Sequence, residues 1–124
     1  MADNTIVGGA EAFAEKFGLG QTYTDYRKML AKADVEAVLV CLPTGLHKEA
    51  TLAAAKAGKH IFCEKPIDLD PTRIRRTLEV VDRAGVKLQI GFMRRFDRNF
   101  IQAKETIDSG AIGDVVLVKS LTHG

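Results

Sequence analysis

The chain has 124 residues, enough for one domain rather than two. It is 46% hydrophobic and 27% charged, which argues against a disordered, collagen-like or coiled-coil protein. Eighteen basic and sixteen acidic side chains leave a net charge of +2, so nothing suggests a nucleic acid as partner. No apolar run approaches the roughly 18 residues of a membrane span, and Met1–Asn4 lack the charged-then-apolar pattern of a secretion signal. We therefore expect a cytoplasmic protein.

The cysteine and histidine pattern gives no sign of a disulfide framework or a metal. The two cysteines lie in apolar stretches, where we expect buried, reduced thiols. Cysteines and histidines together show no ligand spacing such as C-x-x-C or H-x-x-x-H, so no metal site is predicted. These residues are Cys41, Cys63, His47, His60 and His123.

Two helices are expected before the first strong strand signal. Residues 10–17 carry two phenylalanines on one helical face, and Gly18 follows as a stop. Thr24-Asp25 then opens a short helix. The unbroken apolar run Ala37–Leu42 comes next and fits a strand that is covered on both faces, as in a parallel sheet.

Strand-like and helix-like stretches then alternate along the chain. Thr44 is expected to cap one helix with its hydroxyl, and Asp70, followed by Pro71, to cap the next. Gly58, Gly85 and Gly110 stand where three helices should end. After the first strand, further strands are expected over residues 60–63, 86–92 and 114–120.

This alternation predicts an α/β fold with crossover connections in a parallel sheet. A linker or domain edge fits at Gly110–Gly113. Such sheets bind ligands beyond the carboxyl ends of their strands, so residues 42–47, 63–66 and 92–96 should lie together at one rim.

Thr44 and His47 occupy the first of these segments. If Thr44 begins a helix, the backbone amides and the positive dipole end there could hold a phosphate, a carboxylate or an amide-bearing ring. A plain helix cap is the equally acceptable alternative. His47 lies in the first helical turn, where a histidine is more often a surface or capping residue than a catalyst.

Lys65 is a more specific candidate for a functional residue than Thr44 or His47. Pro66 restricts Lys65 to extended backbone, so its ammonium should point into the cleft. Partial burial there would lower its pKa toward the range useful for proton transfer, and Glu64 could orient it. The alternative is a turn with a solvated ion pair.

Two further features can be weighed as ligand sites. Arg94 and Arg95 could clamp a phosphate or carboxylate, whereas a nucleic-acid patch lacks the aromatic interleaving that would support it. Neither Gly8-Gly9 nor Gly18-Leu19-Gly20 has the strand before it and the glycine spacing of a dinucleotide-binding turn.

Three motifs in register resemble one enzyme family. AGKHIFCEKPIDLD at residues 57–70, Pro43-Thr44-x-x-His47 and GFMRRFD at residues 91–97 resemble the glucose–fructose oxidoreductase and inositol dehydrogenase family (Gfo/Idh/MocA). The residues of these motifs most resemble those of inositol 2-dehydrogenases. The similarity extends from about Ala10 to the end of the chain.

The resemblance implies a partial Rossmann-like, doubly wound parallel sheet, lacking its first βαβ segment, in residues 1–110. Residues 111–124 would begin a second, α/β substrate domain with its first strand. It implies NAD-dependent oxidation of a secondary alcohol on a cyclic polyol or sugar, with NADP as a possible cofactor. Lys65 would be catalytic and would contact both substrate and cofactor, and His123 would lie near the substrate. The other cofactor-binding residues would be Asp3, Pro43, Thr44, His47, Glu64, Arg94 and Arg95.

The family's glycine-rich turn and most of its second domain have no counterpart in this sequence. We therefore expect the isolated chain to be weakly active or inactive. Residues 38–42 would form an exposed strand edge, which favours self-association, and the family is commonly homo-oligomeric. A non-catalytic sensor of dinucleotide or sugar on the same fold is the alternative, although a sensor has no need of a proton-transfer lysine.

Overall fold

The computed structural model describes residues 9–121. The chain divides between Gly91 and Phe92 into two compact units, each described here by itself. None of the helices in residues 9–121 has the length and apolar character needed to cross a membrane.

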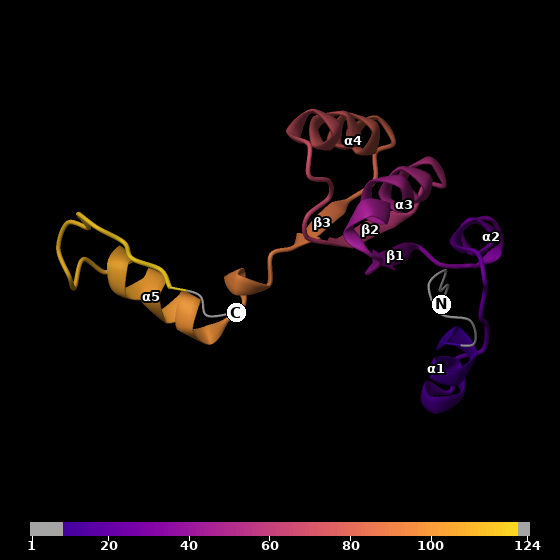
Figure 1. Cartoon of the computed structure of the whole chain (residues 1–124), viewed down its shortest axis with the longest axis horizontal. Coiled ribbons are helices and arrows are strands. Elements are labelled where there is room, and N and C mark those ends of the chain that lie inside the picture. Colours follow the sequence, from indigo (N-terminus) through magenta and orange to yellow (C-terminus); the bar gives the residue numbers. More distant parts are fainter. Residues whose placement is uncertain (1–8, 122–124) are drawn as a thin grey trace. The chain divides into compact units, whose positions relative to one another are not determined.

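The first unit alternates helices and strands in the predicted order (Figure 1). It contains α1 (Gly9–Phe17), α2 (Tyr26–Lys32), β1 (Ala37–Val40), α3 (Thr44–Lys56), β2 (His60–Glu64), α4 (Pro71–Arg83) and β3 (Leu88–Gly91). The second unit contains the 3₁₀ helix η1 (Met93–Arg95) and α5 (Arg98–Asp108).

The strands of the first unit form a parallel sheet in the order β1-β2-β3. The register pairs Val40 with Cys63 and Glu64 with Gly91. The strands' inward side chains share one core with residues of both α3 and α4, so the two crossover helices cover the same face of the sheet (Figure 1). Two crossovers of the same hand that step in one direction across a sheet produce this arrangement.

No described element of the first unit covers the opposite face of this sheet. Val38 and Val40 are buried, whereas Leu39 between them is 74% exposed. The prediction that the 37–42 run is covered on both faces is therefore wrong here, because both helices lie on one side. Cys41 is exposed for the same reason, against the prediction that both thiols are buried.

Helix boundaries follow the predicted signals with one exception. Asp70 Oδ1 accepts a hydrogen bond from the Thr72 N–H at 2.8 Å, with Pro71 as the first helical residue. Gly58 has a φ of +69° just beyond α3. The exception is Thr44, which does not cap α3. Pro43 occupies the cap position in extended backbone and makes no side-chain cap hydrogen bond, so Thr44 is already helical.

The second unit confirms the helix predicted there but not the strand. Asp97 Oδ1 accepts hydrogen bonds from the Asn99 and Phe100 N–H groups at the start of α5. Residues 114–120 form no strand, although their valine content predicts one. An extended segment becomes a strand only when another pairs with it, and these side chains are exposed. The domain boundary between residues 110 and 111 remains a prediction.

The alternation of burial along the strands leads to a stability test. Ile61→Ala should lower the free energy of unfolding by about 3 kcal/mol, because Ile61 is 3% exposed and its truncation leaves a cavity. Leu39→Ala should change it by less than about 0.5 kcal/mol, because Leu39 is already largely in solvent. Urea unfolding of both variants measures the difference. Equal losses would show that the second face of the sheet is covered in solution.

Candidate functional site

The carboxyl ends of the three strands meet at one edge of the sheet, as parallel pairing requires. This edge carries Pro43 and Thr44 after β1, Glu64 and Lys65 at the end of β2, and Gly91 at the end of β3. Thr44 and Lys65 are exposed and therefore accessible to a ligand. The prediction that residues 42–47 and 63–66 lie together at one rim of the sheet is confirmed.

His47 is a buried link between two parts of this edge. It is 2% exposed. Its Nδ1 lies 2.7 Å from the Pro66 carbonyl oxygen, and its Nε2 is within hydrogen-bond distance of the Leu42 carbonyl oxygen. The expectation of a surface or capping histidine is wrong, because both partners come from neighbouring loops rather than from the helix of His47.

Lys65 and Glu64 take different positions at the edge. The Lys65 side chain is exposed, so the predicted partial burial of its ammonium is wrong. Its ammonium forms no ion pair with any residue in the described range. The Glu64 carboxylate instead accepts a hydrogen bond from the backbone N–H of Lys65 at 3.2 Å. The lysine is thus left available to a ligand.

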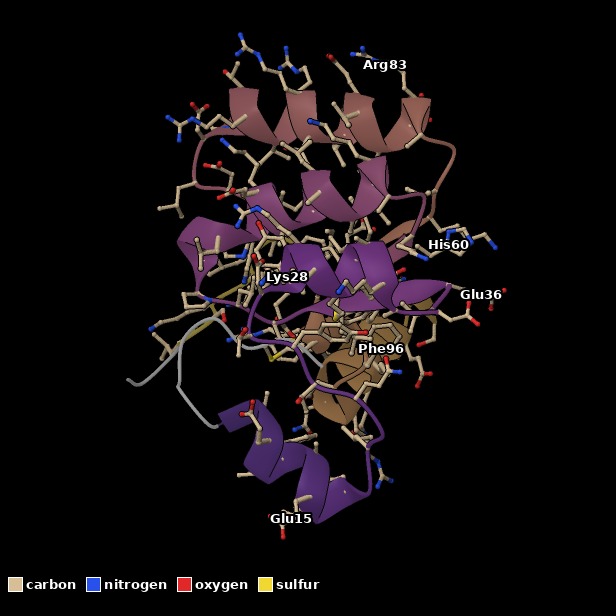
Figure 2. The ribbon with its side chains drawn as sticks, turned by 90° about the vertical axis from the view of Figure 1, so that its right-hand side faces the viewer. Glu15, Lys28, Glu36, His60, Arg83 and Phe96 are labelled. Atoms are coloured by element: carbon tan, nitrogen blue, oxygen red, sulfur yellow. The ribbon has the colours of Figure 1, made fainter. Side chains whose placement is uncertain are left out.

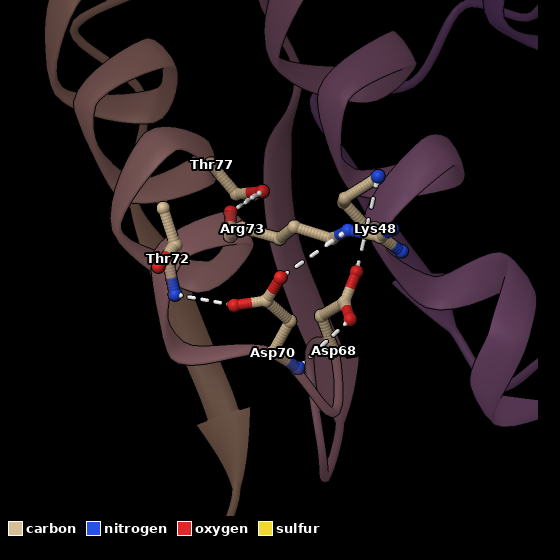
Figure 3. Close-up of polar contacts among 6 residues, drawn as sticks. All are labelled: Lys48, Asp68, Asp70, Thr72, Arg73 and Thr77. Atoms are coloured by element: carbon tan, nitrogen blue, oxygen red, sulfur yellow. Dashed lines mark hydrogen bonds and ion pairs between the residues drawn. The ribbon is translucent and has the colours of Figure 1, made fainter.

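Asp68 holds the loop between β2 and α4 (Figure 3). Its Oδ1 accepts a hydrogen bond from the Asp70 N–H at 3.0 Å, and its Oδ2 lies 3.8 Å from Lys48 Nζ on α3. The Asp70 N–H is the main cause that lowers the pKa of Asp68, with the Leu69 N–H and the charges of Arg73 and Lys48 adding to it and desolvation opposing it. Asp68 was not among the residues singled out from the sequence, because its ion-pair partner lies twenty positions away.

Cys63 is a structural residue at the same end of β2. Its side chain is fully buried, and its Sγ donates to the Glu64 carbonyl oxygen at 3.2 Å. Burial raises the pKa of this thiol. The prediction of a buried, reduced thiol is confirmed for Cys63.

Four predicted site residues fall outside the described part of the first unit. Arg94 and Arg95 belong to the second unit, where the Arg94 guanidinium lies 4.9 Å from the centre of the Phe100 ring. Arg95 is exposed. Asp3 and His123 fall outside the described residues.

Comparisons with known proteins agree with a parallel sheet that carries a ligand site at the carboxyl ends of its strands. Residues 5–92 match the profile of GFO_IDH_MocA, described as an oxidoreductase family with an NAD-binding Rossmann fold. The chain is 46% identical over 109 residues to inositol 2-dehydrogenase of Rhizobium meliloti (strain 1021), covering 88% of this chain and 32% of that protein. A match to myo-inositol 2-dehydrogenase of Thermotoga maritima is 46% identical and covers 80% and 30%.

A solved structure of an inositol dehydrogenase has a similar fold. The chain superposes with a TM-score of 0.83 on scyllo-inositol dehydrogenase from Lactobacillus casei with bound NAD(H) and scyllo-inositol. The two are 36% identical, and the match covers 91% of this chain and 33% of that one. This chain therefore spans about a third of the length of the relatives it matches.

The buried histidine can be tested against an exposed one. His47→Ala should lower the free energy of unfolding by about 2–3 kcal/mol, because it removes a side chain that is 2% exposed together with its hydrogen bond to a loop carbonyl. His60 lies at the other end of β2, in the region of Glu36 (Figure 2), and its Nδ1 accepts a hydrogen bond from the Lys87 N–H at 3.1 Å. His60→Ala should therefore cost less than about 1 kcal/mol. Similar urea midpoints for both variants would contradict the linking role of His47.

The lowered pKa of Asp68 predicts a pH dependence of stability. A carboxyl group whose pKa is lower in the folded state stabilises the fold above its unfolded pKa, and this contribution is lost as the pH falls through the folded pKa. Wild type should thus be more stable than Asp68→Asn at pH 7, and this difference should shrink below about pH 4. Urea unfolding between pH 7 and pH 3 measures it. Glu36→Gln, at an exposed site, is the control, and a difference that persists at pH 3 would contradict the prediction.

Proposed function

Because this chain belongs to the oxidoreductase family with an NAD-binding Rossmann fold, we propose that it is part of an NAD-dependent enzyme that oxidises a secondary alcohol on a cyclic polyol. One observation carries the proposal. The exposed start of α3 and the exposed ammonium-bearing Lys65 lie at the same edge of a parallel sheet. The names of the relatives support an inositol as the substrate.

The residues at the start of α3 fit a dinucleotide. The first N–H groups of a helix have no carbonyl partner within it, and they carry the positive end of the helix dipole. Thr44 and Gly45 are exposed there, and a side chain added at Gly45 would meet nothing within 4 Å. This open, electropositive surface suits a phosphate or the carboxamide of a nicotinamide ring.

In this proposal Lys65 acts on the substrate hydroxyl. Its ammonium donates a hydrogen bond to the hydroxyl oxygen, orients it, and stabilises the negative charge that develops as its proton leaves. Acceptance of the hydride from the same carbon is the chemistry that NAD supplies when bound. The hydroxyl proton, which Lys65 helps to transfer, passes to solvent water, and the alcohol that has lost this proton and the hydride is a ketone. The Glu64 carboxylate holds the backbone of Lys65 by accepting a hydrogen bond from the Lys65 N–H. His47 holds the next residue through the Pro66 carbonyl oxygen.

The remaining assignments are also part of the proposal. Arg94 and Arg95 contact the cofactor or its surroundings, Asp3 binds the adenosine ribose, and His123 lies near the substrate. Residues 1–110 belong to the NAD-binding domain and residues 111–124 begin the substrate domain. The isolated 124-residue chain is weakly active or inactive, and the protein assembles as a homo-oligomer.

Calorimetric titration of the 124-residue chain with NAD tests the proposal first. Saturable binding supports it, and no binding at millimolar NAD contradicts it for this chain. Where myo-inositol is turned over, Lys65→Ala should lower kcat by about 100-fold, the low end of what a proton-transfer group contributes.

Lys119→Ala is the matched control, because Lys119 is an exposed lysine outside the sheet. It should leave kcat within about twofold of wild type.

A further inference from the structure

Gly91 lies directly beneath a carboxylate. It is the last residue of β3 and pairs with Glu64 of β2. A Cβ atom on Gly91 would lie 3.1 Å from Glu64 Oε1, 3.2 Å from Cδ and 3.3 Å from Oε2. These three atoms make up the whole carboxylate group. The Glu64 side chain therefore extends across the sheet onto the space that the glycine leaves open.

The need for glycine at this position is one of space, not of backbone conformation. Gly91 is not among the described glycines with positive φ. At Gly20 and Gly45, by contrast, an added Cβ would meet nothing within 4 Å. Non-bonded carbon atoms attract each other best at about 3.5–4.0 Å. A methyl group at residue 91 would thus displace the Glu64 carboxylate by a few tenths of an ångström.

The displaced group has a specific partner. Glu64 Oε2 accepts the backbone N–H of Lys65 at 3.2 Å. This hydrogen bond already lies at the long end of the usual range for N–H···O bonds, about 2.7–3.2 Å. A small shift that takes Oε2 away from the Lys65 nitrogen is therefore enough to weaken it. The same shift would change where this negative charge lies at the edge that carries Lys65.

We propose that Gly91 is a positioning residue, which lets the Glu64 carboxylate lie on β3 and hold the backbone of Lys65. This inference rests on the proposed function, because it takes Glu64 and Lys65 to be among the residues that contact NAD. Gly91 itself contacts neither substrate nor cofactor in this scheme. It acts through Glu64, the side chain whose place it leaves free.

The direct test is the amide resonance of Lys65 in a ¹H–¹⁵N NMR spectrum of the full chain. Glu64→Ala removes the acceptor and gives the position of the resonance without this hydrogen bond. Gly91→Ala should move the Lys65 resonance toward that position. Gly20→Ala is the matched control and should leave it unmoved, because Gly20 also lacks a positive φ and has nothing within 4 Å of an added Cβ.

A rescue experiment separates positioning from general damage. Gly91→Ala should weaken NAD binding about tenfold, as expected when one hydrogen bond to a charged group is disturbed. Glu64→Asp shortens the side chain by one methylene and frees the space above residue 91. In the Glu64→Asp background, Gly91→Ala should therefore change NAD affinity by less than about twofold.

Clear outcomes overturn the inference. An unmoved Lys65 resonance in Gly91→Ala, or equal losses of NAD affinity in both backgrounds, would show that Glu64 is not displaced. A large fall in the urea midpoint of Gly91→Ala would show a packing role instead. If wild type binds no NAD, the proposed function fails for this chain, and the NMR comparison still decides whether Gly91 positions Glu64.

Discussion

The candidate site depends on the buried imidazole of His47. Its two ring nitrogens face the carbonyl oxygens of Leu42 and Pro66, which belong to the loops that follow β1 and β2. A buried imidazole that contacts both carbonyls and donates a hydrogen bond to one of them favours one geometry of the two loops. The start of α3 and the segment that carries Lys65 are thereby held at a constant separation. Without this link, parallel pairing alone would bring only the strand ends together.

The loop that follows Pro66 is also fixed at its far end, where it enters α4. Asp68 accepts the N–H of Asp70 and lies beside Lys48 of α3, while Asp70 caps α4 and lies 3.5 Å from Arg73 (Figure 3). The exposed ion pairs in this group contribute little by themselves. The hydrogen bonds to backbone N–H groups are more directional, and they define the path of the chain from β2 to α4. Lys65, just before this loop, has an exposed side chain and a backbone N–H that is held by Glu64.

Much of the fold could be predicted because its signals are local. The capping carboxylates of Asp25 and Asp70, the glycines that follow the helices, and the apolar runs of the strands act over a few residues. The predicted strand over residues 114–120 failed because a strand also needs a partner, which a propensity for extended backbone does not supply. Thr44 failed as a cap because Pro43 takes the non-helical position one residue earlier.

The sequence by itself determined the order of the elements, the parallel sheet and the edge at which ligands should bind, since hydrophobic period and turn residues encode these features. The resemblance of its motifs to one enzyme family could also be recognised from the sequence alone. Only the tertiary structure decided that His47 is buried and Lys65 exposed, and that Glu64 lies over Gly91. It also decided that both crossover helices cover one face, which leaves Leu39 and Cys41 exposed. These properties depend on contacts between residues far apart in the chain, and no local pattern encodes such contacts.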